Sequence, residues 1–174
     1  MAFVFMGKGV RSRSIDCVLE EMQFLYEKRD VRHFEWLDDD LLFDRHQIKD
    51  LLSRIIAKGW DIKWSANNGL IASSIDEEMM DLIQRSGCIG FKIGIETGNP
   101  EMLRKVKKPG THRRFLAFSK MVEAYPGPFI GGNFIVGLPG ETFGQMMDSL
   151  RFSLEMNIDW SAFTVCQVIR GASA

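Results

Sequence analysis

The feature that most constrains the fold is a regular alternation of capped amphipathic helices with short apolar strands along the 174 residues. Five segments between the helices have the length and composition of strands: 32–37, 61–66, 89–95, 129–136 and 160–168. Helices that alternate with short strands predict βαβ units and a parallel sheet. Since such crossovers are right-handed, the sheet is either doubly wound or rolled into a barrel.

Helix starts are predicted from residues that cap the first turn. These are Ser14, Asp44 with Gln47, Ser74 with Glu77, Asn99 before Pro100, Thr111, and Thr142 with Gln145. In the helix that follows Thr142, the spacing of Met146, Leu150 and Leu154 predicts that these side chains face the core.

The strands alternate apolar and polar residues, whereas strands buried on both faces are continuously apolar. Ile62 and Trp64 alternate with Lys63 and Ser65, and the next strand alternates Ile89, Phe91, Ile93 and Ile95 with Gly90, Lys92, Gly94 and Glu96. One face is therefore expected to pack on helices, while the other is small, polar or charged. A barrel whose lumen holds a polar ligand has this pattern; the alternative is a sheet with one solvated face.

Composition excludes several classes of protein. The net charge is −1, which argues against nucleic-acid binding, and no apolar run is long enough to span a membrane. With 45% hydrophobic and 26% charged residues, the chain is expected to be a soluble, cytoplasmic, single-domain protein.

Cysteine and histidine give no metal signature. Cys17, Cys88 and Cys166 are far apart and odd in number, so they predict small buried hydrophobes rather than disulfides or ligands. His33, His46 and His112 do not cluster either.

Acidic, amide and glycine residues follow four successive strands, at the edge where βα barrels carry their sites. The segments are 38–40, 65–69, 94–98 and 137–142. Asp38 to Asp40 could bind a cation or form a solvated loop, and Glu96 could accept sugar hydroxyls or pair with Lys92. The glycines from 131 to 140 lack the Lys-Ser/Thr of a phosphate loop, so they suit either a flat ligand at close range or a strand-to-helix turn.

Read in order, these segments resemble a radical S-adenosylmethionine (SAM) enzyme. The closest resemblance is to the branch that often carries an N-terminal cobalamin-binding domain. The likeness runs from about Val10 to about Phe163 and rests on Val10–Ser14, Phe34–Asp39, Ile62–Asn67, Ser86–Cys88, Gly94–Gly98 and Phe134–Thr142.

The resemblance implies an α/β fold, an incomplete (β/α) barrel of about five parallel strands with outer helices. It assigns the methionine amino group of SAM to Asp38 and Asp39 and the ribose to Glu96. The adenine falls to the fifth family strand and its loop, namely Ile135, Gly137, Leu138, Pro139, Gly140 and Glu141. Asn67 and Gly94, within the matching motifs, complete the expected cofactor-binding set.

The departures from the family pattern limit the expected activity. The CxxxCxxC loop that binds a four-iron cluster in the family is absent, so no [4Fe–4S] cluster is expected, and SAM should bind weakly. Cobalamin belongs to the parent branch. The sequence looks like the middle of the family, with an extension at 1–13, a partial barrel at 14–168 and a tail at 169–174.

The expected parent reaction is reductive cleavage of SAM to a 5′-deoxyadenosyl radical, or methyl transfer, with this chain inactive alone. The alternatives are a non-catalytic scaffold that binds SAM or another small molecule, and an unrelated α/β barrel that binds a metabolite. A homo-oligomer is expected, because strand 160–168 has no charge or proline to protect an exposed edge.

Overall fold

The computed structural model describes residues 12–38, 41–107 and 110–167, which form two compact units divided after Arg32. No helix in these ranges is long and apolar enough to cross a membrane. In the first unit, helix α2 (Ile15–Arg29) begins after Ser14, whose hydroxyl accepts the Cys17 amide, as predicted. The predicted extension and tail lie almost entirely outside the described residues, so those boundaries stay predictions.

The second unit alternates strands and helices. In chain order it contains β1 (His33–Trp36), α3 (Arg45–Lys58), β2 (Lys63–Leu70), the short 3-10 helix η1 (Ala72–Ser74), α4 (Glu77–Arg85), β3 (Cys88–Glu96), α5 (Pro100–Lys105), α6 (His112–Val122), β4 (Phe129–Val136), α7 (Phe143–Glu155) and β5 (Trp160–Val165).

Four of the helix caps predicted for this unit are confirmed, at Asp44, Asn99, Thr111 and Thr142. The cap predicted at Ser74 is wrong. Ser74 closes η1 by donating its backbone N–H to the Ile71 carbonyl, so α4 starts two residues later. There the Asp76 carboxylate accepts the Met79 amide at 2.9 Å, and aspartate caps a helix as well as serine does.

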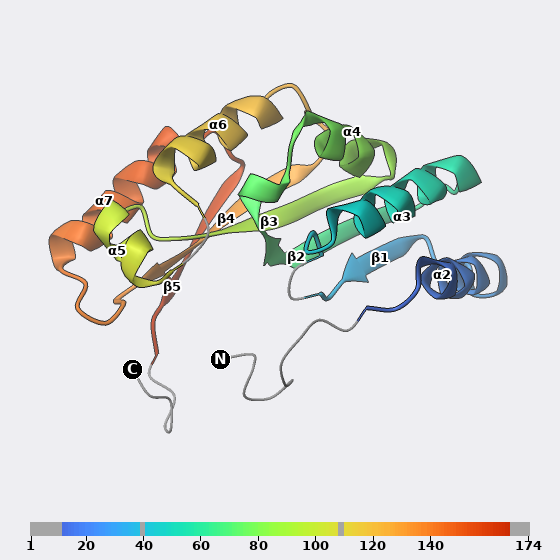
Figure 1. Ribbon diagram of the computed structural model, residues 1–174, viewed down its shortest axis with the longest axis horizontal. Helices are drawn as coiled ribbons and strands as arrows, with labels where there is room; N and C mark the ends of the chain where they lie inside the picture. Colours follow the sequence, from blue (N-terminus) through green and yellow to red (C-terminus); the bar gives the residue numbers. More distant parts are fainter. Residues whose placement is uncertain (1–11, 39–40, 108–109, 168–174) are drawn as a thin grey trace. The chain divides into compact units, whose positions relative to one another are not determined.

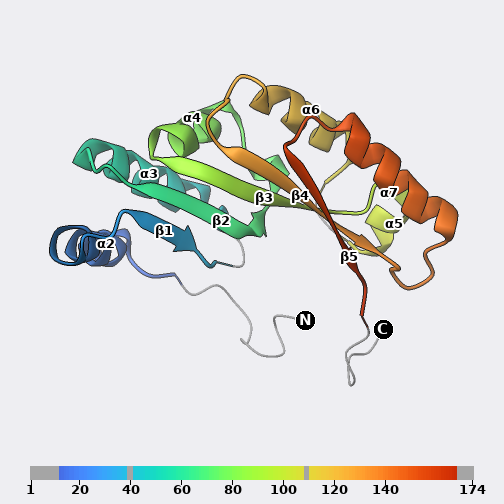
Figure 2. The same ribbon diagram turned by 180° about the vertical axis from the view of Figure 1, so that it is seen from behind.

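All five strands are parallel and lie in the order β1-β2-β3-β4-β5. Figures 1 and 2 show helices α3, α4, α6 and α7 on the same side of this curved sheet. Strands that are neighbours in sequence and in space, with every covering helix on one side, form part of a barrel wall. The incomplete barrel is confirmed, and the doubly wound alternative, in which helices cover both faces, is wrong.

The two faces of the sheet differ as the alternation predicted. Toward the helices point large apolar side chains, including Trp64, Phe91, Ile93, Ile95 and Phe134, each 1% exposed or less. The opposite face, called the inner face below, carries Ser65, Lys92, Gly94 and Asn133, and Gly94 pairs with Asn133 in the register. The apolar core therefore lies between sheet and helices.

Two predictions of buried side chains are wrong. Ile89 is 46% exposed, because the register shifts at this point: Trp64 pairs with Cys88 while Ser65 pairs with Gly90, which leaves Ile89 as an extra residue. On α7, Leu150 is 42% exposed and Leu154 80% exposed, whereas Ser149 and Phe152 are buried. The small Ser149 side chain faces inward because Gly98 approaches the backbone of α7 closely at this position.

Candidate functional site

Amide side chains tie the carboxyl ends of β1 and β2 together. The Asn67 amide donates to the Glu35 carboxylate at 2.7 Å, and the Asn68 amide donates to the carbonyl oxygens of Leu37 and Asp38 at 2.9 and 3.3 Å. The exposed Asp38 is thereby held at the carboxyl edge of the sheet by its backbone. Asp39 lies outside the described residues.

A bulge in β2 brings a glycine into the middle of the inner face. The register of β2 against β3 shifts between Ala66 and Leu70, and Gly69 has a φ of +101°, which favours glycine. A Cβ at Gly69 would lie 3.6 Å from the Gly94 nitrogen and 3.9 Å from Nδ2 of Asn133. Three strands thus approach one another here through glycine backbone and one amide side chain.

Glu96 ends β3 beside this glycine pair. Its φ of +69° is rare for a residue other than glycine, and strained backbone of this kind clusters at functional sites. The carboxylate folds back along the strand, so that Oε1 lies 3.4 Å from the position of a Cβ on Gly94. A carboxylate can accept hydrogen bonds from two neighbouring hydroxyl groups.

The backbone after Glu96 is fastened to α7. The Gly98 amide donates to the Ser149 hydroxyl at 2.8 Å, and that hydroxyl lies 3.2 Å from the Thr97 hydroxyl. The Asn99 amide group donates to the Asp148 carboxylate at 2.8 Å. Sequence reasoning missed Ser149 and Asp148, because nothing in the local sequence marks a serine or aspartate as the partner of a strand end about fifty residues away.

A carboxylate also organises the loop after β4. Oε2 of Glu141 accepts the amides of Gly137 and Leu138 at 2.6 and 3.0 Å, and the Glu141 amide donates to the Leu138 carbonyl at 2.9 Å. Gly137 and Gly140 have φ values of +78° and +76°, so the turn requires glycine at both positions. Oε1 of Glu141 is buried and has no hydrogen-bond partner among the described residues.

This loop joins the inner face at Ile135. Ile135 is half-buried and pairs in register with Thr164 of β5, while Pro139 and Gly140 are exposed. The predicted adenine segment is thus an apolar strand end followed by a hydrogen-bonded turn whose tip is exposed.

The cysteines do not form a cluster site. Burial raises the pKa of the Cys88 thiol, at the amino end of β3, to about 12. Cys166 follows the carboxyl end of β5, and Cys17 belongs to the first unit. Across the described ranges, no three His, Cys, Asp or Glu side chains converge on a point that could hold a metal. A four-iron cluster needs closely placed thiolates, so this donor set does not fit one.

Comparison with known proteins identifies the family. Residues 3–153 match the radical SAM superfamily. Curated relatives include an uncharacterized methyltransferase of Pyrococcus horikoshii, 28% identical over 159 residues, and the bacteriochlorophyllide d C-12(1)-methyltransferase of Chlorobaculum tepidum, 29% identical over 164 residues. The alignments cover 91% of this chain in both cases, but only 34% and 35% of the relatives.

Solved structures show the same fold. The radical S-adenosylmethionine methyltransferase TsrM from Kitasatospora setae, determined with cobalamin and a [4Fe–4S] cluster, superposes with a TM-score of 0.79 at 20% identity, over 91% of this chain and 32% of TsrM. The cobalamin-dependent radical enzyme OxsB gives a TM-score of 0.67 at 18% identity, over 82% of this chain and 22% of OxsB. The chain spans about a third of the length of the curated relatives it matches. On the family match over most of its length, this chain belongs to the radical SAM superfamily.

Proposed function

We propose that this chain forms the SAM-binding part of a radical SAM enzyme of the methyl-transferring type. Membership of the superfamily sets aside the alternative of an unrelated metabolite-binding barrel. Methyl transfer is supported by relatives that are named methyltransferases, one of which acts on a bacteriochlorophyllide and one on cytidylyl-2-hydroxyethylphosphonate. Since those proteins are about three times longer, their substrates do not identify a substrate for this chain.

The observation that carries the proposal is the arrangement of Gly69, Gly94, Glu96 and Asn133 on the inner face. The glycines place no side chain between a ligand and the backbone, and the Glu96 carboxylate beside them suits the two ribose hydroxyls. The apolar end of β4 and the loop held by Glu141 then lie at the adenine, while Asp38 and Asp39 receive the methionine ammonium group.

In the family, a bound cluster supplies the electron that cleaves SAM. The described residues do not offer its ligands, so we expect the polypeptide alone to bind SAM without cleaving it. The same observation favours a second candidate, a non-catalytic SAM-binding scaffold. The two candidates share the pocket and differ in whether a cluster-bearing segment or partner joins it.

Calorimetric titration with SAM and S-adenosylhomocysteine tests the pocket. We expect weak, saturable binding, which Glu96→Gln weakens about tenfold through loss of charge-assisted hydrogen bonds. Glu123→Gln is the matched control, because Glu123 is exposed at the end of α6 and is not one of the predicted site residues. No heat at millimolar ligand, or equal affinities for wild type and Glu96→Gln, would remove the assignment.

A further inference from the structure

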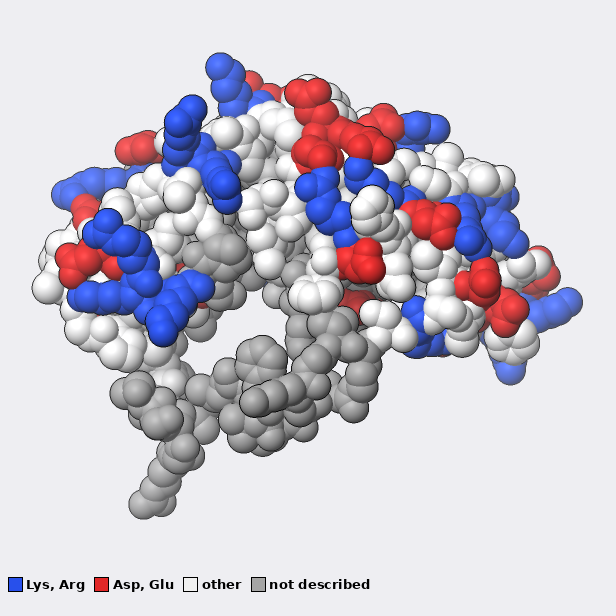
Figure 3. Space-filling view, viewed as in Figure 1, with Lys and Arg blue, Asp and Glu red and all other residues white. Residues whose placement is uncertain are grey.

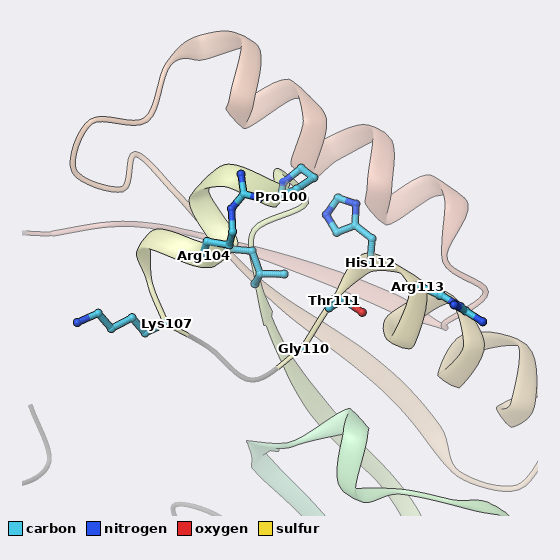
Figure 4. Close-up of a pocket in the computed structure, with 8 residues that line it drawn as sticks. Pro100, Arg104, Lys107, Gly110, Thr111, His112 and Arg113 are labelled. Atoms are coloured by element: carbon cyan, nitrogen blue, oxygen red, sulfur yellow. The ribbon is translucent and has the colours of Figure 1, made fainter.

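Helix α7, the last of the helices that cover the sheet, has one covered flank and one open flank. On the covered flank the Asn99 amide group donates to the Asp148 carboxylate at 2.8 Å. On the same flank the His112 ring stacks on Phe152, with centroids 4.2 Å apart. Figure 4 shows Pro100 of α5 and His112 of α6 beside the ribbon of α7. Because the covering helices follow the order of the strands, the other flank of α7 lies toward β5.

The open flank of α7 is apolar. A helix turns by about 200° over two residues, so Leu154 points away from Phe152. Leu150 lies one turn before Leu154, and Phe143 lies two turns before Leu150, so all three share this flank. Their exposed fractions are 76% for Phe143, 42% for Leu150 and 80% for Leu154. The leucines predicted to face the core therefore form an exposed apolar row.

Strand β5 continues this apolar surface at the edge of the sheet. Phe163 stacks on the buried Phe134, with ring centroids 4.9 Å apart, so Phe163 faces the helical side of the sheet. Val165, two residues later, faces the same side. Since α7 packs on β4, Phe163 remains 39% exposed and Val165 64% exposed. These two side chains and the three on α7 are called the open strip below.

The open strip differs from the other helical surfaces in charge. Figure 3 shows basic and acidic side chains together over α3 and α4, where Arg45 pairs with Asp76. The open strip has no charged side chain. Its exposed fractions correspond to on the order of 500 Å² of apolar surface, as large as the largest patches on typical monomers. With the backbone edge of β5, the area approaches the roughly 800 Å² per partner of a stable interface.

The outward backbone groups of β5 match a second copy of the same strand. The Cys166 amide donates to the Val136 carbonyl of β4 at 2.8 Å. Because backbone groups alternate in direction along a strand, those of Ser161, Phe163 and Val165 point outward from the sheet edge. In an antiparallel pair centred on Phe163, Ser161 of one copy is opposite Val165 of the other. Every outward group of these three residues then has a partner.

We propose that a second copy of this chain binds at β5, through antiparallel pairing of residues 160–165 about a two-fold axis at Phe163. The axis is perpendicular to the sheet, so the helices of both copies lie on the same side of a continuous sheet. The two open strips then cover each other between the two α7 helices, in an isologous interface typical of homodimers. The dimer does not depend on SAM binding, since the proposed pocket lies on the inner face.

Sedimentation velocity across the micromolar range tests for the dimer, which should have twice the chain mass of 19.9 kDa. Amide exchange followed by NMR locates the contact. The Phe163 and Val165 amides should be protected in the dimer and lose protection on dilution, whereas the Cys166 amide, bonded to β4, should keep it. A 19.9 kDa species throughout, or a Phe163 amide that exchanges freely in the dimer, would overturn the proposal and leave the open strip to a different polypeptide.

Matched variants test the two parts of the interface. Ser161→Pro removes an outward amide and Leu154→Lys places a charge in the open strip. Each should raise the dissociation constant at least tenfold, because the two-fold axis makes every substitution act twice. The controls are Ser161→Ala, which keeps the amide, and Ser53→Lys, which adds the same charge at an exposed position of α3. Both should stay within about twofold of wild type, and thermal midpoints check that all four variants fold.

The variants also give two outcomes that would refute the interface. A dissociation constant for Leu154→Lys no higher than that for Ser53→Lys would show that the open strip is not buried in the dimer. A Ser161→Pro variant that dimerises as tightly as Ser161→Ala would show that β5 does not pair. A failure of SAM to bind affects only the proposed function, because none of these measurements uses SAM.

Discussion

Gly98 is the position at which the site depends most sharply on close packing. A Cβ there would lie 2.6 Å from Cβ of Phe152, 2.7 Å from Cα of Ser149 and 2.8 Å from the Asp148 carbonyl oxygen. Two of these atoms are α7 backbone, so no side chain can rotate away. Gly98→Ala should therefore cost about 1–3 kcal/mol from overpacking. Displacing the Gly98 amide from the Ser149 hydroxyl adds about 1 kcal/mol, for a total of about 2–4 kcal/mol.

Urea unfolding followed by circular dichroism measures this loss, and the thermal midpoint should drop by about 4–16 °C in a chain of this size. Gly144→Ala is the matched control on the same helix. Only the Thr142 hydroxyl, at 3.9 Å, lies near a Cβ at Gly144, so alanine should stabilise the protein by about 0.5–1 kcal/mol. If Gly98→Ala unfolds within about 0.5 kcal/mol of wild type, α7 does not approach the strand end as closely as described.

Four further outcomes are expected. Glu141→Ala should lower the free energy of unfolding by about 1–2 kcal/mol, because the amides of Gly137 and Leu138 lose their acceptor; an unchanged urea midpoint would contradict this. Burial lowers the pKa of His112 below 6.5, against weaker opposing effects of nearby acids. The unfolded chain therefore takes up a proton at a higher pH than the folded protein does. The contribution of His112 to stability is fully present above pH 6.5 and decreases as the pH falls below it. His112→Gln should make the free energy of unfolding depend less on pH, and parallel pH profiles for the variant and the wild type would contradict this explanation. Anaerobic reconstitution with iron and sulfide should give no stoichiometric [4Fe–4S] absorbance, because the three cysteines lie on separate elements; a full cluster spectrum would show otherwise. Finally, β5 is an edge strand without charge or proline, so light scattering at micromolar concentration should show a dimer or larger assembly and not a monodisperse 19.9 kDa species.

Local chemistry explains which parts of the fold could be predicted from the sequence. A capping residue acts within three positions, so the starts of α5 and α7 at Asn99 and Thr142 were predictable. Side chains along a strand alternate between its two faces, so the sequence pattern placed Phe91 and Ile93 on the face of the sheet that the helices cover. The carboxyl ends of parallel strands lie at the same edge of the sheet. For this reason Glu96 could be expected near the glycines that follow the neighbouring strands.

Contacts between distant segments could not be predicted in this way. The bulge at Ile89 depends on how β3 pairs with β2, and the outward position of Leu154 depends on how closely the strand end approaches α7. Hydrophobicity alone favoured the leucines over Ser149 for the buried face, but steric room decided the outcome. The hydrogen bond from Asn67 to Glu35 likewise joins two elements whose pairing no short-range pattern specifies.

The hydrogen bonds between the carboxyl end of β3 and α7 also determine when this strand end becomes supported during synthesis. The hydrogen bonds from Thr97, Gly98 and Asn99 span 52, 51 and 49 positions. At translation rates of about 5–20 residues per second, Glu96 leaves the ribosome about 3–10 s before its support exists. Contacts over such separations form late in folding as well. A substitution that slows the docking of α7 therefore prolongs the interval in which this strand end is unsupported, so its first effect is on the yield of correctly folded chains and not on their final stability.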